Sequence, residues 1–184
     1  MTASAQNLSE LVAQLDSDQM NQCTEARNGI QQRLTDSTAP TADANARRAL
    51  EQEALQILQS DPSHPAQVWL LRMLELTGSE ASVPVIASYL SNPDAELRDC
   101  ARRALVANTA PQATVVLYQA ILRSSDAEKR PYIDGFIFRG DRRAAKVIVP
   151  LLKSNDADTV TQAANALVVL NEPSVYSELK VAHT

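Results

Sequence analysis

Aromatic residues and glycine are scarce in this sequence, and both shortages limit the fold. Aromatic residues make up 4% of the chain and only four glycines occur, whereas alanine occurs 28 times. Sheets favour aromatic and β-branched residues, while alanine is the strongest helix former. The composition therefore disfavours a sheet protein and predicts an all-α fold.

Cysteine and long apolar runs are also scarce. Cys23 and Cys100 stand alone, without a CxxC pair or a framework of spaced cysteines, so neither a disulfide scaffold nor a zinc site is predicted. We expect both to be small buried residues. No apolar run is long enough to cross a bilayer, and the polar start MTASAQN has no signal-peptide core. The sequence predicts a soluble, cytoplasmic protein without a membrane partner.

The motifs of the common enzyme classes are missing as well. The chain has no GxSxG, GxGxxG, Walker loop or HExxH, and its only histidines are His64 and His183. His64 lies in DPSHPAQ, where Ser63 or His64 begins a helix and Pro65 suits an early helical position, so a structural role is favoured. We therefore expect no enzymatic activity, no metal site and no cofactor.

The strongest positive signal is internal repetition. SYLSNPDAELRDCARRAL, residues 88–105, matches PLLKSNDADTVTQAANAL, residues 150–167, at a constant offset of 62 residues. A unit between them fits with a shift of 32, which places Asp94 on Asp126. The period is therefore about 31 residues, which is typical of helical repeat proteins.

Each repeat unit is predicted to contain two helices. Apolar residues in 83–90 and again in 97–105 follow the i, i+3, i+4, i+7 spacing of one helical face. The break between them contains Pro93 and ends in Asp94, a residue type that caps helices. A helical hairpin with one apolar side can bury that side only against its neighbours, so the pattern predicts an α-solenoid.

Extending the pattern outward predicts about five to six antiparallel helix pairs in a single domain, residues 1–184. Residues 35–45 are small, polar and proline-containing, and we expect a flexible loop there that separates the N-terminal pair from the rest. The pairs are expected at residues 8–34, 43–77, 81–107, 111–139 and 142–170, with the first helix of a sixth pair at 175–181.

Two long segments carry a pattern that is specific to one family. SVPVIASYLSNPDAELRDCARRAL has a VP in its first helix, an NPDAELR turn and small alanines in its second helix, and GDRRAAKVIVPLLKSNDADTVTQAANAL follows it. In TGSEASVP and RGDRRAAK a glycine precedes a polar residue at the turn between repeats. Over residues 68–170 the chain resembles HEAT repeats, in the short bacterial form shared with bilin-lyase-type repeats. The resemblance implies a right-handed superhelix with the second helices on its concave side.

HEAT repeats use an aspartate and an arginine as a ladder between neighbouring repeats. The fifth unit departs from the family because Val160 stands at the arginine position, so we expect the ladder to stop before it. Pro131 is a second departure, and the helix that contains it should begin near Arg130 or bend there. The ladder positions map to Asp94 with Arg98, to Asp126 with Arg130, and to Asp156 alone.

Charge is uneven along the chain, although the net charge is -5. Residues 1–108 carry eight Lys and Arg against 14 Asp and Glu, whereas residues 109–154 carry eight against four. Such a basic block is often a solvated face, but it also suits an acidic segment of a protein partner. The net charge disfavours nucleic acid as the partner. The residues expected to contact the partner are Arg102, Arg130, Arg139, Arg142 and Arg143.

The resemblance and the missing motifs together predict a non-catalytic scaffold that binds a protein or peptide. Three alternatives stay open: an enzyme resembling the bilin lyases, a nucleic-acid-linked protein resembling the HEAT-like DNA glycosylases, and a helical module of a larger multidomain protein. The chain lacks the reactive His or Cys cluster of a lyase. The net charge does not suit a glycosylase, and Trp69, flanked by leucines, suits a core or an interface. The sequence indicates neither the partner nor the oligomeric state.

Overall fold

A computed structural model describes residues 7–171 of the chain. This described part consists of helices, short 3-10 turns and connections, and it contains no strand, which confirms the all-α prediction. The chain divides between Ala110 and Pro111 into two compact units, which we call unit 1 and unit 2.

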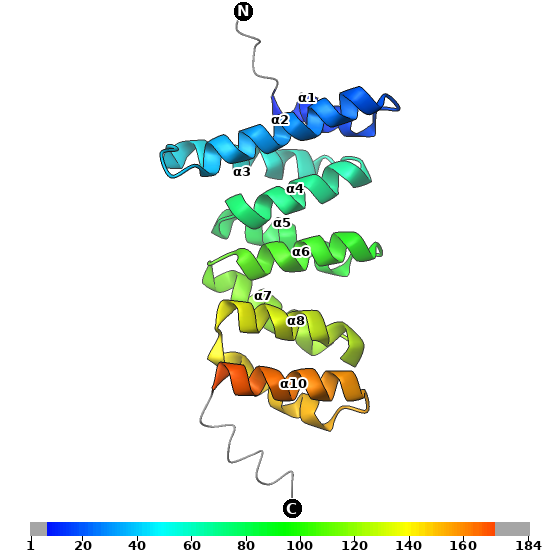
Figure 1. The fold of residues 1–184 in the computed structure, drawn as a ribbon, viewed down its shortest axis with the longest axis vertical. Helices are drawn as coiled ribbons and strands as arrows, with labels where there is room; N and C mark the ends of the chain where they lie inside the picture. The colour runs from blue at the N-terminus through cyan, green and yellow to red at the C-terminus, as the bar shows by residue number, and fades with distance from the viewer. Residues whose placement is uncertain (1–6, 172–184) are drawn as a thin grey trace, which may run out of the picture. The chain divides into compact units, whose positions relative to one another are not determined.

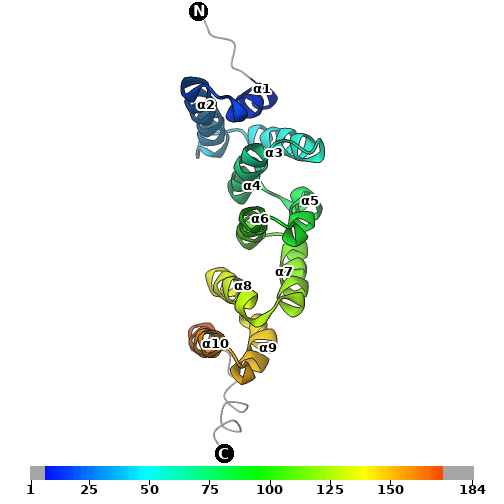
Figure 2. The same ribbon diagram turned by 90° about the vertical axis from the view of Figure 1, so that its right-hand side faces the viewer.

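Unit 1 contains three helix pairs. Its helices are α1 (Leu8–Ala13), α2 (Met20–Thr38), α3 (Ala44–Gln59), α4 (His64–Thr77), α5 (Val83–Ser88) and α6 (Ala95–Ala107). Within this unit α2, α4 and α6 form one layer and α1, α3 and α5 form the other (Figures 1 and 2). The connection between α2 and α3 is shorter than expected, because α2 continues to Thr38 and only residues 39–43 lie between the helices.

Two helices of unit 1 begin where the sequence predicts a helix start. Asp94 accepts a hydrogen bond from the backbone nitrogen of Leu97 at 3.0 Å, so it caps α6 as predicted. The predicted start of α4 is also confirmed, with His64 as its first residue and Pro65 in its first turn. A side-chain cap therefore marks the start of α6, whereas a proline in the first turn marks the start of α4, where Ser63 forms no capping hydrogen bond.

The core of unit 1 lies between the two layers. Leu71, Ile86 and Leu105 have no exposed surface, and Cys23 and Cys100 are buried and free, as expected. Trp69 is half-buried in α4. The apolar faces read from the sequence are therefore the faces that pack.

Polar contacts join successive helix pairs of unit 1 at their turns. Gly78 ends α4 so close to its own helix that an added Cβ would lie 2.5 Å from the carbonyl oxygen of Leu74. Ser79 follows it and donates to the buried carboxylate of Glu51, from its backbone nitrogen at 2.6 Å and from Oγ at 2.9 Å. Asn108 Nδ2 donates to the Ser79 carbonyl at 2.7 Å. This turn has the predicted order of a glycine followed by a polar residue.

Unit 2 contains two further pairs among the described residues. Its helices are α7 (Pro111–Arg123), α8 (Asp126–Arg139), the short α9 (Ala145–Ile148) with 3-10 turns on both sides, and α10 (Ala157–Leu170). Within this unit α8 and α10 form one layer and α7 and α9 the other (Figure 2). The described residues thus hold five of the predicted pairs, and the helix expected at 175–181 lies outside them. None of the described helices is long and apolar enough to cross a membrane.

The turn after α8 shares with the turn after α4 a glycine followed by a polar residue that caps a 3-10 turn, but its glycine has a different backbone conformation. Gly140 ends the helix with a left-handed φ of 62°, which glycine adopts without strain. Asp141 then caps the 3-10 turn at 142–144 and accepts a hydrogen bond from the Tyr118 hydroxyl at 2.8 Å. The Tyr118 ring stacks on the buried Phe136, with ring centres 5.0 Å apart. Burial, followed by the hydrogen bond to Asp141, raises the pKa of Tyr118.

Of the two expectations for α8, a start near Arg130 or a bend there, the structure contradicts the first. The helix begins at Asp126 with a capping box and continues through Pro131, instead of beginning near Arg130. A proline at position 131 has no N–H to pair with the carbonyl of Ala127. The Nε of Arg130 donates to that carbonyl at 3.4 Å, so the oxygen that the proline would leave unpaired has a partner.

Candidate partner-binding surface

The five arginines predicted to contact a partner lie at three places. Arg102 belongs to α6 of unit 1, where its Nη2 lies 2.6 Å from Asp99 Oδ1. Arg130 lies in the first half of α8. The other three surround the end of α8, about 13 Å along the helix from Arg130. Within unit 2 the structure therefore brings together only Arg139, Arg142 and Arg143.

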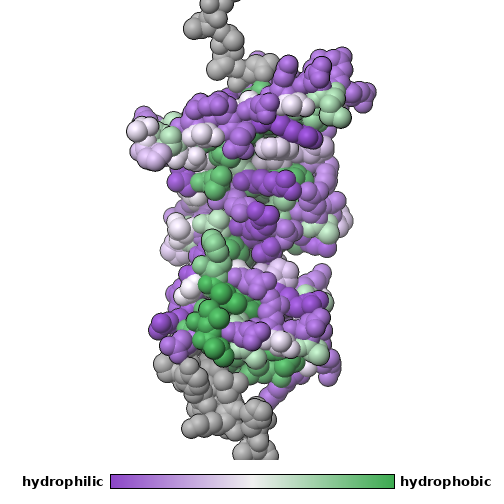
Figure 3. All heavy atoms as spheres, viewed as in Figure 1, coloured by the Kyte–Doolittle hydropathy of each residue, from purple (hydrophilic) through white to green (hydrophobic). Residues whose placement is uncertain are grey.

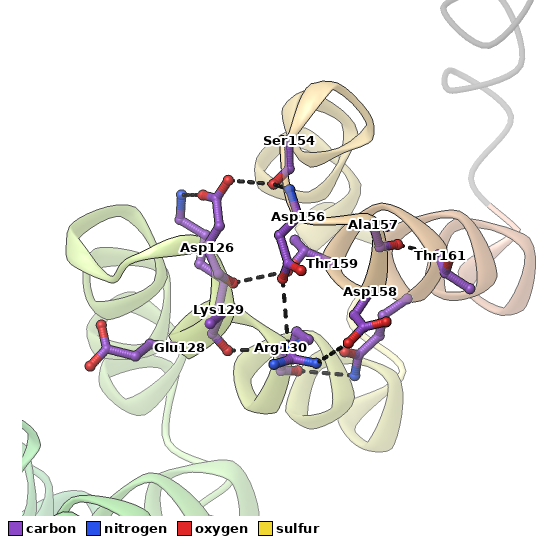
Figure 4. A network of polar contacts seen from close by, with 12 residues as sticks. Asp126, Glu128, Lys129, Arg130, Ser154, Asp156, Ala157, Asp158, Thr159 and Thr161 are labelled. Atoms are coloured by element: carbon purple, nitrogen blue, oxygen red, sulfur yellow. Dashed lines mark hydrogen bonds and ion pairs between the residues drawn. The ribbon is translucent and has the colours of Figure 1, made fainter.

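Arg130 belongs to a polar network that links the fourth and fifth helix pairs (Figure 4). Its Nη1 lies 3.1 Å from Asp158 Oδ2, and its Nε lies 4.0 Å from Asp156 Oδ2. Its carbonyl oxygen accepts a hydrogen bond from Gln162 at 3.2 Å. The ladder therefore reaches the fifth pair, contrary to the expectation. Val160 does not interrupt it, because the arginine comes from the preceding repeat.

Asp126 is the other anchor of this network. Its carboxylate accepts hydrogen bonds from Ser154 Oγ and, at 2.9 Å, from Lys129 Nζ. Thr159 Oγ1 donates to the Asp126 carbonyl at 3.1 Å and to Asp156 at 2.5 Å. The hydrogen bond from Ser154, then that from Lys129, lowers the pKa of Asp126, and the one from Thr159 lowers the pKa of Asp156. These groups hold two repeats together.

The corresponding positions of unit 1 are arranged differently. Arg98 donates from Nη1 to the carbonyls of Asn92 and Pro93, both at 2.8 Å, so it braces its own turn and is not seen to reach a neighbouring repeat. Asp94 instead contacts His64 of the preceding repeat, whose Nε2 lies 3.3 Å from Asp94 Oδ2. His64 therefore has the structural place that its sequence context favoured.

Two of the three arginines near the end of α8 are engaged within unit 2. Arg139 is half-buried and donates from Nη2 to Thr114 Oγ1 at 2.7 Å. The Nε of Arg143 lies 3.0 Å from Asp141 Oδ1. Burial would raise the pKa of Asp141, but hydrogen bonds from Arg143 and then Tyr118 outweigh it and lower that pKa. Arg142 is exposed, and its side chain has no partner within residues 7–171.

Four exposed cations of unit 2 belong to the basic block predicted from the sequence, and Arg142 is the one of them that was also an expected partner contact. Its described residues, 111–171, carry eight Lys and Arg against six Asp and Glu, a net charge of +2. Four of these cations are exposed with no side-chain partner in the described part of the chain. They are Arg123, Arg142, Lys146 and Lys153.

Exposed apolar side chains on α8 and α10 were missed by the sequence reasoning. Phe138 is 78% exposed, Val168 70% and Val169 63%, and we call these three residues the apolar patch. The polar network shows that α8 and α10 run side by side in the same direction, and hydrophobic residues gather over their C-terminal ends (Figure 3). The repeat offset places Val168 at the position of Phe138. The sequence did contain a signal for this patch, because Phe138 and Val168 are apolar residues at the same repeat position, outside the face that is buried.

Acidic, cysteine and histidine side chains do not gather into a metal-binding cluster within residues 7–171.

One solved structure and one family model are consistent with this architecture. A solved complex of CpcE and CpcF of phycocyanin lyase from Nostoc sp. PCC7120 is 19% identical, with a TM-score of 0.56, covering 97% of this chain and 70% of that one. A solved engineered protein is 19% identical, with a TM-score of 0.46, covering 90% and 97%. Curated protein sequences give no significant match. The family model of HEAT repeats matches residues 51–134. Residues 51–134 therefore match HEAT repeats, and the described part of the chain has a helical-repeat fold.

Proposed function

We propose that this chain is a non-catalytic scaffold that binds an acidic, partly apolar segment of another protein through unit 2. The observation that carries the proposal is the apolar patch. Large apolar side chains that gather on the surface of a soluble domain typically mark an interaction site. Phe138 is more exposed than any other large apolar residue of the described chain, which makes it the expected anchor.

Charge supports an acidic partner. The described residues of unit 1 carry eight Lys and Arg against 14 Asp and Glu, a net charge of -6, whereas those of unit 2 sum to +2. Arg142 and Lys146 follow α8 in the sequence, and no side-chain partner within residues 7–171 occupies them. Unpaired cations attract an acidic segment over long range and so raise its association rate. A modest local charge in an acidic chain also favours a protein over nucleic acid.

The phycocyanin lyase structure is itself a complex of two proteins, which supports a protein partner for this fold. We expect the scaffold to act in the cytoplasm, where free cysteines stay reduced.

A panel of synthetic 15-residue amphipathic helices tests the proposal. All three peptides carry leucine on one face, with glutamate, lysine or glutamine on the other. We expect fluorescence anisotropy to detect binding of the glutamate peptide, and we expect the double variant Phe138→Ser and Val168→Ser to lose it. Leu122→Ser is the matched control, since Leu122 is 69% exposed in α7 of the same unit.

The charge contribution has its own variant. Arg142→Glu with Lys146→Glu should slow association of the glutamate peptide and reduce its dependence on salt. Equal binding of all three peptides, or an equal loss in the Leu122→Ser control, would contradict the proposed surface.

A further inference from the structure

A pocket of about 430 Å³ opens in unit 1 beside the connection between α3 and α4. Leu58, Pro84 and Val85 supply apolar walls, and Asp61 and Tyr89 supply polar groups. No basic side chain of the described chain lines it. The volume is within the range of pockets that hold a small ligand or one long side chain.

Asp61 holds an unusual backbone conformation at this pocket. It follows the end of α3 with a left-handed φ of 51°, at a position where glycine is the common residue. Its Oδ1 accepts a hydrogen bond from Gln67 Nε2 at 3.1 Å, and Oδ2 has no partner within residues 7–171. The chain thus keeps an exposed carboxylate in a conformation that costs other residues strain.

Tyr89 lies half-buried in the same pocket. Its hydroxyl has no hydrogen-bond partner within residues 7–171. Burial and the charge of Asp61 raise the pKa of Tyr89, which keeps the hydroxyl protonated. The pocket therefore combines one free carboxylate oxygen, one free hydroxyl, an aromatic ring and apolar walls, in a unit with a net charge of -6.

We propose that the pocket formed by Asp61 and Tyr89 binds the guanidinium group of an arginine side chain from a protein partner. A carboxylate forms charge-assisted hydrogen bonds with a guanidinium, and an aromatic ring attracts it further. The apolar walls suit the methylene stem of arginine. The ammonium group of lysine is a compact point charge, so it matches the carboxylate of Asp61 and the ring of Tyr89 less well than a planar guanidinium does. This site lies in unit 1 and binds a cationic side chain, whereas the apolar patch of unit 2 is proposed to bind an acidic segment. The inference therefore goes beyond the proposed function.

The test uses the full chain and the peptide acetyl-Ala-Arg-Ala-amide. A matched peptide with citrulline in place of arginine keeps the shape and removes the charge. We expect the arginine peptide to shift the backbone amide NMR signals of Asp61, Val85 and Tyr89, and the citrulline peptide to bind about three- to fivefold more weakly, as for a partly exposed ion pair.

Asp61→Asn is the matching protein variant, because asparagine tolerates the left-handed conformation and lacks the charge. This variant should bind the arginine peptide about three- to fivefold more weakly than the parent does, and its circular dichroism spectrum should be unchanged. Asp18→Asn, an exposed position elsewhere in unit 1, should leave binding as in the parent. Equal affinity for the two peptides, equal affinity of the Asp61→Asn variant, or shifts confined to residues outside the pocket would overturn the proposal. None of these results bears on the glutamate peptide and unit 2.

Discussion

Arg130 serves both its own helix and the neighbouring repeat. Its Nε donates to the Ala127 carbonyl, which Pro131 would otherwise leave without a partner, and its Nη1 pairs with Asp158 of the next pair. One guanidinium can do both because it presents several donors in a fixed plane. A proline inside a helix and an arginine beside it are therefore a coupled pair.

Replacing Pro131 by alanine tests this coupling. We expect the free energy of unfolding to rise by about 1 to 3 kcal/mol, because alanine restores the backbone hydrogen bond and the helical propensity. Arg130→Ala should cost less in that background than in the parent, since the Ala127 carbonyl then has a backbone partner. A double-mutant cycle from urea unfolding measures the difference. A cycle with no coupling would show that Arg130 does not compensate for the proline.

The candidate site shows what single residues in a sequence can and cannot reveal. The basic block was visible as a count of charges, but the partners of its members come from elsewhere in the chain. Thr114, the partner of Arg139, lies 25 residues earlier, and Asp158 lies 28 residues after Arg130. Which cations stay free therefore depends on packing. Arg142 is the one predicted residue whose side chain is without a partner in residues 7–171.

At the scale of helices, the apolar spacing and the caps predicted most boundaries, because both are local. α6 begins at Ala95 after Asp94, and α4 begins at His64. One error arose where a distant residue decides the outcome, in the ladder, which takes its arginine from the preceding repeat. The end of α2 was also missed, because its last turn continues into a polar segment that reads as a loop.

The packing of the second helices is tested by truncating one buried leucine in each unit. Leu105 is 0% exposed and Leu167 3%, so each replacement by alanine should cost about 2 to 5 kcal/mol of unfolding free energy. Val169→Ala is the control, because this exposed side chain should change stability by less than about 0.5 kcal/mol. Chemical denaturation measures all three. Leucine variants as stable as the control would show that the helical register is wrong.

The polar network between α8 and α10 predicts a response to acid. The pKa values of Asp126 and Asp156 are lowered in the folded chain, below the value near 3.9 of an unfolded aspartate. Their contribution to stability is therefore complete above about pH 4 and is lost as the pH falls through the lowered pKa values. Urea unfolding between pH 7 and pH 2 should show this fall, and Asp126→Asn should make it smaller. An unchanged acid profile in that variant would mean that the carboxylate contributes nothing.

At the scale of the whole molecule, the division between Ala110 and Pro111 suggests that unit 1 needs no residue of unit 2 to fold. Each repeat of such a protein gains most of its stability from its immediate neighbours. A fragment of residues 1–110 should therefore keep a helical circular dichroism spectrum and unfold in one cooperative step. A fragment with the spectrum of an unfolded chain would show that the units depend on each other.

At the scale of the whole molecule, we propose that the partner binds unit 2, at the apolar patch and the exposed cations that follow α8. Hydrogen–deuterium exchange of the full chain, with and without the 15-residue glutamate peptide, tests this most directly, because it reports every segment at once. We expect the peptide to slow exchange in the C-terminal halves of α8 and α10. In the variant with Phe138→Ser and Val168→Ser, we expect the same exchange rates with and without the peptide. Protection confined to unit 1, or protection that survives in the variant, would contradict it.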